Sequence, residues 1–411
     1  MYKIEIMKKL IFCFALLILG EISFAQVRNS DTLTNAPMNS VQNVLAGNGD
    51  KRVSIGAYAQ IDYNQGFNDS TQTNGNLDVH RLVLFLGYKF NDRAQFVTEI
   101  EMEHHVELEV EQAFLNYQVL KNNQYLIFRS GLMIIPMGII NEYHEPVTFN
   151  GVERPLVDTK IIPTTWREMG LGFYGNIDKL SLRYQVYLVN GFQSYDGTQG
   201  LLNGTLGFKE GRQEAGENTM NSPGVSSKID FYGIRGLKLG LAAYHGKTQS
   251  PLYDGLSKKD TLANAMADSS IIGVSAFGFD ARYTYKNFET RGEVLYVANS
   301  NTGKYNAFTN NDLGAAMFGY YTEVGYNVLG FIKTTEEKLI AFGRYEYYDT
   351  HFKTKGGLIK NDAYAVRIIT VGLTYRVSNG AAFKADYQLF KNNVAKSQSS
   401  KQFNLGIGIW F

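Results

Sequence analysis

Residues 402–411, QFNLGIGIWF, end the chain on a strict alternation of apolar with polar or small residues. The apolar positions are Phe403, Leu405, Ile407, Ile409 and Phe411. A period of two places alternate side chains on opposite faces of a β-strand. The stretch therefore predicts a strand with one apolar face, and we expect Phe411 to take part in closing a barrel against the first strand.

The same alternation recurs along the chain and predicts about sixteen strands. They lie near 53–64, 78–90, 94–103, 109–119, 125–133, 168–177, 180–190, 225–232, 237–245, 272–285, 288–298, 315–327, 338–348, 364–376, 381–390 and 402–411. Tight connections such as 178–179 alternate with long ones such as 191–224. Short turns at one rim and long loops at the other are typical of outer-membrane barrels. We predict an all-β fold, a transmembrane antiparallel β-barrel, because closure leaves no unpaired sheet edge in lipid.

Composition excludes several classes of protein. The 411 residues are 44% hydrophobic, 19% charged and 13% aromatic, with 40 Lys and Arg against 39 Asp and Glu. The formal net charge of +1 gives no electrostatic footprint for nucleic acid. Beyond the N-terminus, no apolar run is long enough for a transmembrane helix.

The N-terminus predicts export. Lys8-Lys9 precede the apolar residues 10–20, and Ser23-Phe24-Ala25 provide a small-residue cleavage site. We expect residues 1–25 to be a signal peptide, 26–50 a flexible periplasmic lead-in and 51–411 a barrel in the bacterial outer membrane, in contact with lipid and lipopolysaccharide. The only cysteine, Cys13, lies in the signal peptide, so the mature chain has no disulfide.

One long connection, 136–167, differs from the others because it holds four of the seven prolines. With its flanks it contains GLMIIPMG (131–138), TFNGVERP (148–155) and IPTTWRE (162–168). These motifs resemble the phosphate-selective porin O/P family of Bacteroidota-type bacteria, and the resemblance extends from about residue 53 to the C-terminus. It implies a sixteen-stranded, trimeric porin whose third outer loop folds inward to narrow the channel.

The resemblance implies passive diffusion of small hydrophilic solutes, with anions such as phosphate as one class. Two alternatives stay open: a lipase-like outer-membrane enzyme, and a barrel for surface anchoring or interaction without transport. His80, His144, His245 and His351 are scattered singly and no serine has a recognisable base, so we expect no catalytic residues. No nucleotide, haem or zinc signature is present, and we expect no cofactor and no metal.

Charged residues of the predicted loop are the candidates for selectivity. If 136–167 folds inward, Arg154, Lys160 and Arg167 are the bases nearest the narrowest section, with Glu153, Asp158 and Glu168 as counter-charges. The predicted channel lining includes Arg129, Arg183 and Arg344 and about as many acids as bases, which indicates a mixed lumen and weak selectivity. The alternative is that this loop only covers the outer surface.

Three further patterns have simpler explanations than a functional site. The acidic run from Glu101 to Glu111, with His104 and His105, offers ligands for a divalent cation, but a solvated hairpin tip is the preferred interpretation. The spacing of Gly170, Gly172 and Gly175 matches a dinucleotide motif without its strand–helix context. Trp166-Arg167-Glu168 fits an aromatic and ionic latch better than a sugar-stacking track.

Overall fold

The computed structural model describes Asn39, Val41 and residues 52–67, 73–104, 107–121, 123–213, 216–332 and 335–411. The predicted signal peptide, 1–25, lies outside the described residues, as does the predicted lead-in, 26–50, apart from Asn39 and Val41. The described chain is a closed barrel in which sixteen strands follow one another in sequence order and β1 pairs with β16.

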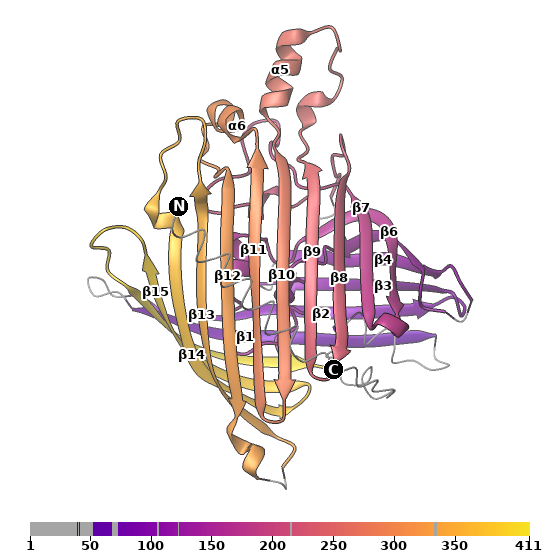
Figure 1. Ribbon diagram of the computed structural model, residues 1–411, viewed down its shortest axis with the longest axis vertical. Coiled ribbons are helices and arrows are strands. Elements are labelled where there is room, and N and C mark those ends of the chain that lie inside the picture. Colours follow the sequence, from indigo (N-terminus) through magenta and orange to yellow (C-terminus); the bar gives the residue numbers. More distant parts are fainter. Residues whose placement is uncertain are drawn as a thin grey trace, which may run out of the picture. The chain divides into compact units, whose positions relative to one another are not determined.

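Sixteen antiparallel strands form the wall (Figure 1). They are β1 (Val53–Phe67), β2 (Asn76–Lys89), β3 (Ala94–Glu103), β4 (Glu107–Gln118), β5 (Ile127–Ile134), β6 (Arg167–Ile177), β7 (Leu182–Val189), β8 (Gly224–Ile234), β9 (Leu237–Lys247), β10 (Gly273–Tyr285), β11 (Phe288–Ser300), β12 (Ala316–Asn327), β13 (Lys338–Lys353), β14 (Ala365–Ser378), β15 (Ala381–Asn392) and β16 (Ser400–Trp410). Each overlaps one of the predicted strands, so the prediction of an all-β barrel is confirmed.

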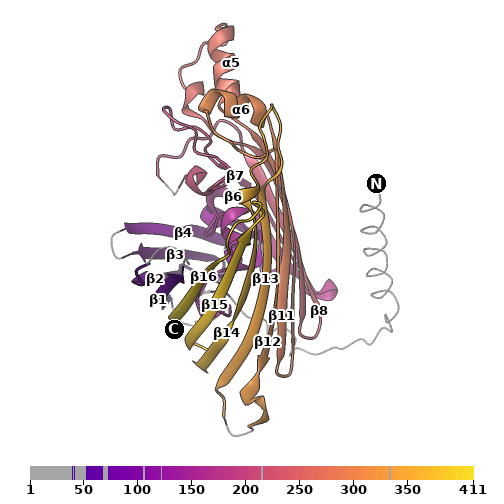
Figure 2. The ribbon, with the colours of Figure 1, turned by 90° about the vertical axis from the view of Figure 1, so that its left-hand side faces the viewer.

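Short helices occur in the connections. They are α3 (Ile139–Glu142), α4 (Val157–Lys160), α5 (Thr261–Ser269) and α6 (Thr302–Thr309). α5 and α6 lie beyond the same end of the barrel, whereas the connection between β12 and β13 lies at the opposite end (Figures 1 and 2). None of the helices in the described residues is both long and apolar enough to span a bilayer.

The two faces of the wall are reversed relative to a water-soluble protein. Large apolar side chains face outward: Leu241 is 62% exposed and Phe277 is 55% exposed. Ionised side chains face inward: Lys228 is 1% exposed and Asp280 is 2% exposed. Charged residues are almost never fully buried in soluble domains unless they are paired. An apolar exterior around a polar interior is the arrangement of a barrel that faces lipid.

The glycines whose spacing matches a dinucleotide motif allow neighbouring strands to pack closely. Gly170, Gly172 and Gly175 all lie on β6, which is followed by a three-residue 3₁₀ turn, η2 (Asp178–Leu180), and then by β7. A Cβ atom at Gly170 or Gly172 would lie 2.1 Å from a carbonyl oxygen of β7. These positions therefore require glycine because the backbone of β7 approaches too closely for a side chain.

A bulge interrupts the pairing of β3 with β4 and changes the interpretation of the acidic run. Glu99 pairs with Gln112, whereas the next residue, Ile100, pairs with Val110, so Glu111 is the extra residue of the bulge. Glu101 and Glu111 are buried inside the barrel, and His104 is exposed at the turn. The interpretation of the whole run as a solvated hairpin tip is wrong, because strand pairing extends through most of it.

Phe411 lies directly after β16 and continues the seam between β16 and β1. Its backbone nitrogen donates to the carbonyl oxygen of Ala57 at 2.9 Å, and its own carbonyl accepts from the nitrogen of Ala57 at 2.9 Å. Its ring is 77% exposed on the outside of the barrel. The backbone and the ring of Phe411 can therefore be tested separately.

Deletion of Phe411 should weaken barrel closure, whereas Phe411→Ala should not. Deletion removes both hydrogen bonds, each worth about 0.5–1.5 kcal/mol net, and the alanine variant keeps them. We expect refolding into detergent to give less heat-modifiable protein for the deletion and a near wild-type amount for Phe411→Ala. If the ring serves as an assembly signal, Phe411→Ala should lower the amount inserted in cells. Wild-type refolding of the deletion variant would refute the role in closure.

Candidate functional site: the lumen loop

Residues 135–166, which we call the lumen loop, connect β5 to β6 and contain α3 and α4. Nearly every residue of this segment is buried. Asn141 ties its two ends together, because its amide nitrogen donates to the carbonyl of Ile135 at 2.7 Å and its oxygen accepts from the backbone nitrogen of Trp166 at 2.7 Å. The loop is thereby closed at its base before it crosses the barrel.

Backbone amides of the lumen loop bind inward-facing carboxylates of distant strands. Ile139 donates to Glu293 of β11 at 2.6 Å and Leu156 donates to Glu346 of β13 at 2.7 Å. Val152 donates to Asp386 of β15 at 2.6 Å. Hydrogen bonds to an ionised acceptor are about twice as strong as neutral ones. Since the acceptors lie on the inner face of well-separated strands, the loop lies inside the barrel.

Arg344 of β13 is the centre of a polar cluster that holds the middle of the loop. Its guanidinium contacts Glu346 at 2.8 Å and Glu323 at 3.4 Å, and also donates to the backbone carbonyl of Glu153 at 3.0 Å. The side-chain amide of Asn150 donates to Glu323 at 3.1 Å and to Glu289 at 2.6 Å. One arginine thus neutralises two wall carboxylates and binds the loop backbone.

A second cluster binds the start of the loop to β8–β10. The ammonium of Lys228 lies 2.5 Å from Glu142 and 2.9 Å from Asp280, and it is fully buried. Lys238 donates to the hydroxyl of Tyr143 at 2.5 Å. From the preceding segment, the side-chain amide of Asn39 donates to the carbonyl of Glu142 at 3.0 Å. Glu142 and Tyr143 therefore fix α3 to the wall.

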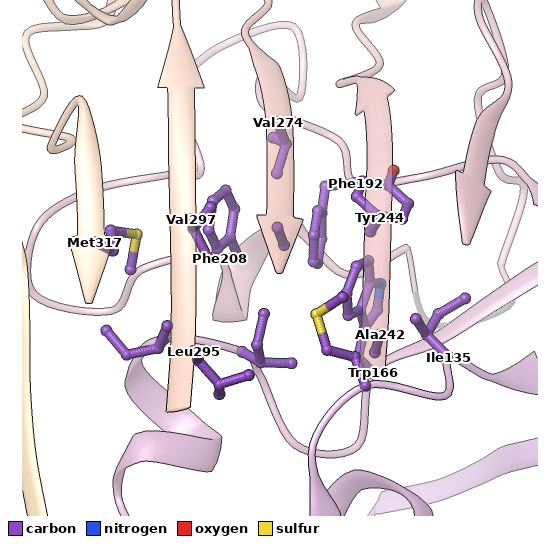
Figure 3. Packing of buried hydrophobic residues seen from close by; sticks show 14 of the residues in the cluster. Ile135, Trp166, Phe192, Phe208, Ala242, Tyr244, Val274, Leu295, Val297 and Met317 are labelled. Atoms are coloured by element: carbon purple, nitrogen blue, oxygen red, sulfur yellow. The ribbon is translucent and has the colours of Figure 1, made fainter. Parts of the chain in front are cut away.

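Aromatic packing anchors the end of the lumen loop. Trp166 is fully buried and stacks on Phe192 with ring centroids 4.6 Å apart. Figure 3 shows Trp166 beside Ala242 and near Phe192 and Tyr244. The indole nitrogen donates to Glu168 at 2.7 Å. A fully buried indole is not accessible to a sugar, so this arrangement agrees with the latch interpretation.

Two of the six predicted selectivity residues begin strand β6. Arg167 pairs with Glu109 of β4, and Glu168 accepts from the Trp166 indole. Both side chains are buried. Arg167 and Glu168 therefore do not pair with each other, and each has a structural contact of its own.

The other four predicted residues lie in the loop itself. Arg154 donates to the carbonyl of His144 at 3.2 Å, and burial and the neighbouring Arg81 lower its pKa to about 10. Lys160 donates to the carbonyl of Thr205 at 3.0 Å. Glu153 accepts from Asn64 at 2.7 Å, and burial raises the pKa of its carboxyl.

Asp158 is the fourth of these residues, and its carboxyl group is buried beside an inward acid of β11. Burial and the adjacent Glu293 carboxylate raise the pKa of Asp158 well above its usual range. Burial beside Glu293 therefore favours the uncharged form of Asp158.

The three predicted channel-lining arginines have different environments. Arg129 lies over the rings of Phe114 and Tyr174, at 3.9 Å and 4.6 Å from their centroids. Arg183 is half-buried opposite Asp230 on the neighbouring strand. Arg344 is buried and paired as described above. Arg344 is thus a loop anchor, which a strand pattern alone did not reveal.

Sequence reasoning also missed several loop residues. Glu142, Tyr143, His144 and Asn150 contact the wall, although none of them was a candidate. The one available signal was the polar run Asn141 to Glu145 inside an otherwise apolar, proline-rich connection. Such a run indicates buried partners, but it does not identify them.

Comparison with known proteins gives one relative by sequence and several by fold. No family model matches the chain. An uncharacterised protein of Aquifex aeolicus is 34% identical over 348 residues, which cover 82% of this chain and 75% of that protein.

Two solved outer-membrane structures share the fold at low sequence identity. The anion-selective porin of Comamonas acidovorans superposes with a TM-score of 0.54 at 12% identity, over 88% of this chain and 100% of the porin. The outer-membrane channel DcaP of Acinetobacter baumannii gives a TM-score of 0.54 at 12% identity, over 87% of this chain and 97% of that structure. The chain therefore belongs to the same family as the Aquifex aeolicus protein, and its fold is that of the outer-membrane porins.

Proposed function

We propose that this protein is an outer-membrane porin through which small hydrophilic solutes diffuse passively. The observation that carries the proposal is the lumen loop, whose backbone amides are held by carboxylates of β11, β13 and β15. A segment fixed across a polar barrel narrows the interior. The porin fold and the resemblance to the phosphate-selective porin O/P family support the same function.

Conductance of the purified barrel in planar bilayers tests this function. A porin gives stable steps whose current is proportional to voltage. A barrel used only for surface anchoring or interaction gives neither current nor hydrolysis. We propose, from the resemblance alone, that the porin is a homotrimer in contact with lipopolysaccharide, and cross-linking of the detergent-solubilised protein tests that assembly.

The enzymatic alternative has one structural feature to weigh. His245 of β9 and Ser275 of β10 lie on the same side of the sheet, with the ring nitrogen 2.9 Å from the hydroxyl. In the part of the chain that the structure describes, no carboxylate or amide hydrogen-bonds the other nitrogen of His245. Hydrolytic serines require an oriented base and an oxyanion hole. We therefore propose that the protein is not an enzyme, and an ester-hydrolysis assay with Ser275→Ala as control tests this.

We further propose a weak preference for anions. Arg154 and Lys160 remain basic groups of the loop, whereas burial raises the pKa values of Glu153 and Asp158 and reduces their negative charge. In a narrow and partly dehydrated passage a fixed charge acts more strongly than at a wide mouth. Phosphate is one anion of suitable size, and the family resemblance favours it.

Neutralising the two loop bases should shift selectivity toward cations. The test variant is Arg154→Gln with Lys160→Gln; Arg167 is left unchanged because it is paired with Glu109. We expect the zero-current potential in a salt gradient to move toward cation preference. The matched control removes three exposed lysines of another long loop, Lys247, Lys258 and Lys259. An equal shift from both variants would refute selectivity at the lumen loop.

Removing Arg344 should destabilise the barrel and loosen the lumen loop. Arg344→Met leaves Glu346 buried without its cation, a loss worth roughly 3–5 kcal/mol, whereas Glu323 keeps Arg291 at 3.0 Å. We expect a lower urea midpoint in detergent and larger, noisier conductance steps. Arg367→Met, on the exposed face of β14, is the control and should change stability by less than about 0.5 kcal/mol. A stable Arg344→Met protein with wild-type conductance would contradict the anchoring role.

A further inference from the structure

Three side chains that could bind a metal ion meet where the lumen loop contacts β3 and β4 of the barrel wall. They are Glu99 of β3, Glu111 of β4 and His144 of the loop, and all three are buried. The Nε2 atom of His144 lies 3.3 Å from Glu99 Oε1 and 3.6 Å from Glu111 Oε2. The three ligating atoms all lie within 4.8 Å of one another.

Neighbouring groups orient two of these side chains. The Nδ1 atom of His144 lies 3.2 Å from the carbonyl oxygen of Asn141, so a proton on Nδ1 leaves the lone pair of Nε2 facing the two carboxylates. The amide of Gln112 donates to Glu99 Oε2 at 2.6 Å and leaves Oε1 facing His144. Partners of this kind fix the tautomer and direction of metal ligands.

The carboxylate of Glu111 has no nitrogen or hydroxyl donor in the described residues. It is completely buried, yet neither oxygen receives a hydrogen bond from a nitrogen or hydroxyl donor in the described residues. The nearby guanidinium of Arg81 is directed elsewhere, 3.4 Å from Glu101 and 3.0 Å from the hydroxyl of Tyr58. A buried carboxylate without donors is costly unless a cation lies beside it.

We propose that Glu99, Glu111 and His144 bind a divalent first-row transition ion of the zinc type. Zinc bonds of about 2.0–2.2 Å in a tetrahedron place neighbouring ligand atoms about 3.3–3.6 Å apart. The separations of His144 Nε2 from the two carboxylate oxygens, 3.3 and 3.6 Å, match this range. Three protein ligands leave the fourth position of the ion for water.

The bound ion would fix the lumen loop to β3 and β4. Glu99 and Glu111 belong to β3 and β4, whereas the carboxylates that hold the loop backbone belong to β11, β13 and β15.

Zinc titration of the purified barrel tests the site without any measurement of conductance. The full chain in detergent is stripped with a chelator, checked for folding by heat modifiability, and titrated with Zn²⁺ in a calorimeter. We expect one tight site per chain, weakened roughly 100-fold or more by His144→Gln and by Glu111→Gln. Co²⁺ in place of Zn²⁺ should give the visible absorption of tetrahedral coordination.

The control concerns a second cluster, Asp78, His80 and His104, which also brings three ligands together. This cluster includes the exposed His104, so His104→Gln should leave the tight site unchanged. Absence of stoichiometric binding by the wild-type barrel would overturn the proposal. Tight binding that survives His144→Gln but is lost in His104→Gln would also overturn it. Neither result depends on whether the protein is a porin.

Discussion

Neutralisation of buried charge is the constraint on which the rest of the structure depends. The inner face of the barrel carries fully buried groups such as Lys228, Glu293 and Glu346. Each requires a partner, because an unpaired ion in a poorly hydrated interior costs several kcal/mol. The lumen loop supplies many of these partners through its backbone amides and through Glu142. Wall and loop therefore stabilise each other, because each supplies partners for buried polar groups of the other.

This mutual dependence explains how a long connection can cross a barrel without a core of its own. Hydrogen bonds from its backbone amides attach the loop to β11, β13 and β15. Lys228 binds Glu142 near the start of the loop, and Trp166 packs at its end. The proposed metal site would attach the loop to β3 and β4 as well. A loop held from several directions keeps a constant shape, which is the property that a selective constriction needs.

The sequence predicted the wall far better than the loop contacts. Alternation identified every strand, and Arg129 and Arg344 of the predicted channel lining are buried. A strand pattern is local, and a period of two decides which face each side chain takes. Glu111 was misplaced because a bulge, which alternation does not show, made it an extra inward residue. Arg167 pairs with Glu109 and Arg344 binds the backbone of Glu153; these partners are distant in sequence, so no spacing could reveal them.

The most direct test of the central claim is a disulfide between the lumen loop and the barrel wall. A Cβ atom at Gly406 of β16 would lie 2.9 Å from Cγ1 of Val152, close to the separation of a Cβ and its partner's sulfur in a disulfide. With Cys13, the only cysteine, replaced by Ala, the pair Gly406→Cys and Val152→Cys should oxidise readily in the folded barrel. The control pair combines Val152→Cys with Gly343→Cys. A Cβ atom at Gly343 would have no atom within 4 Å, so this pair should stay reduced. Free, fully alkylated thiols at 406 and 152 in the folded protein would contradict a loop held across the lumen.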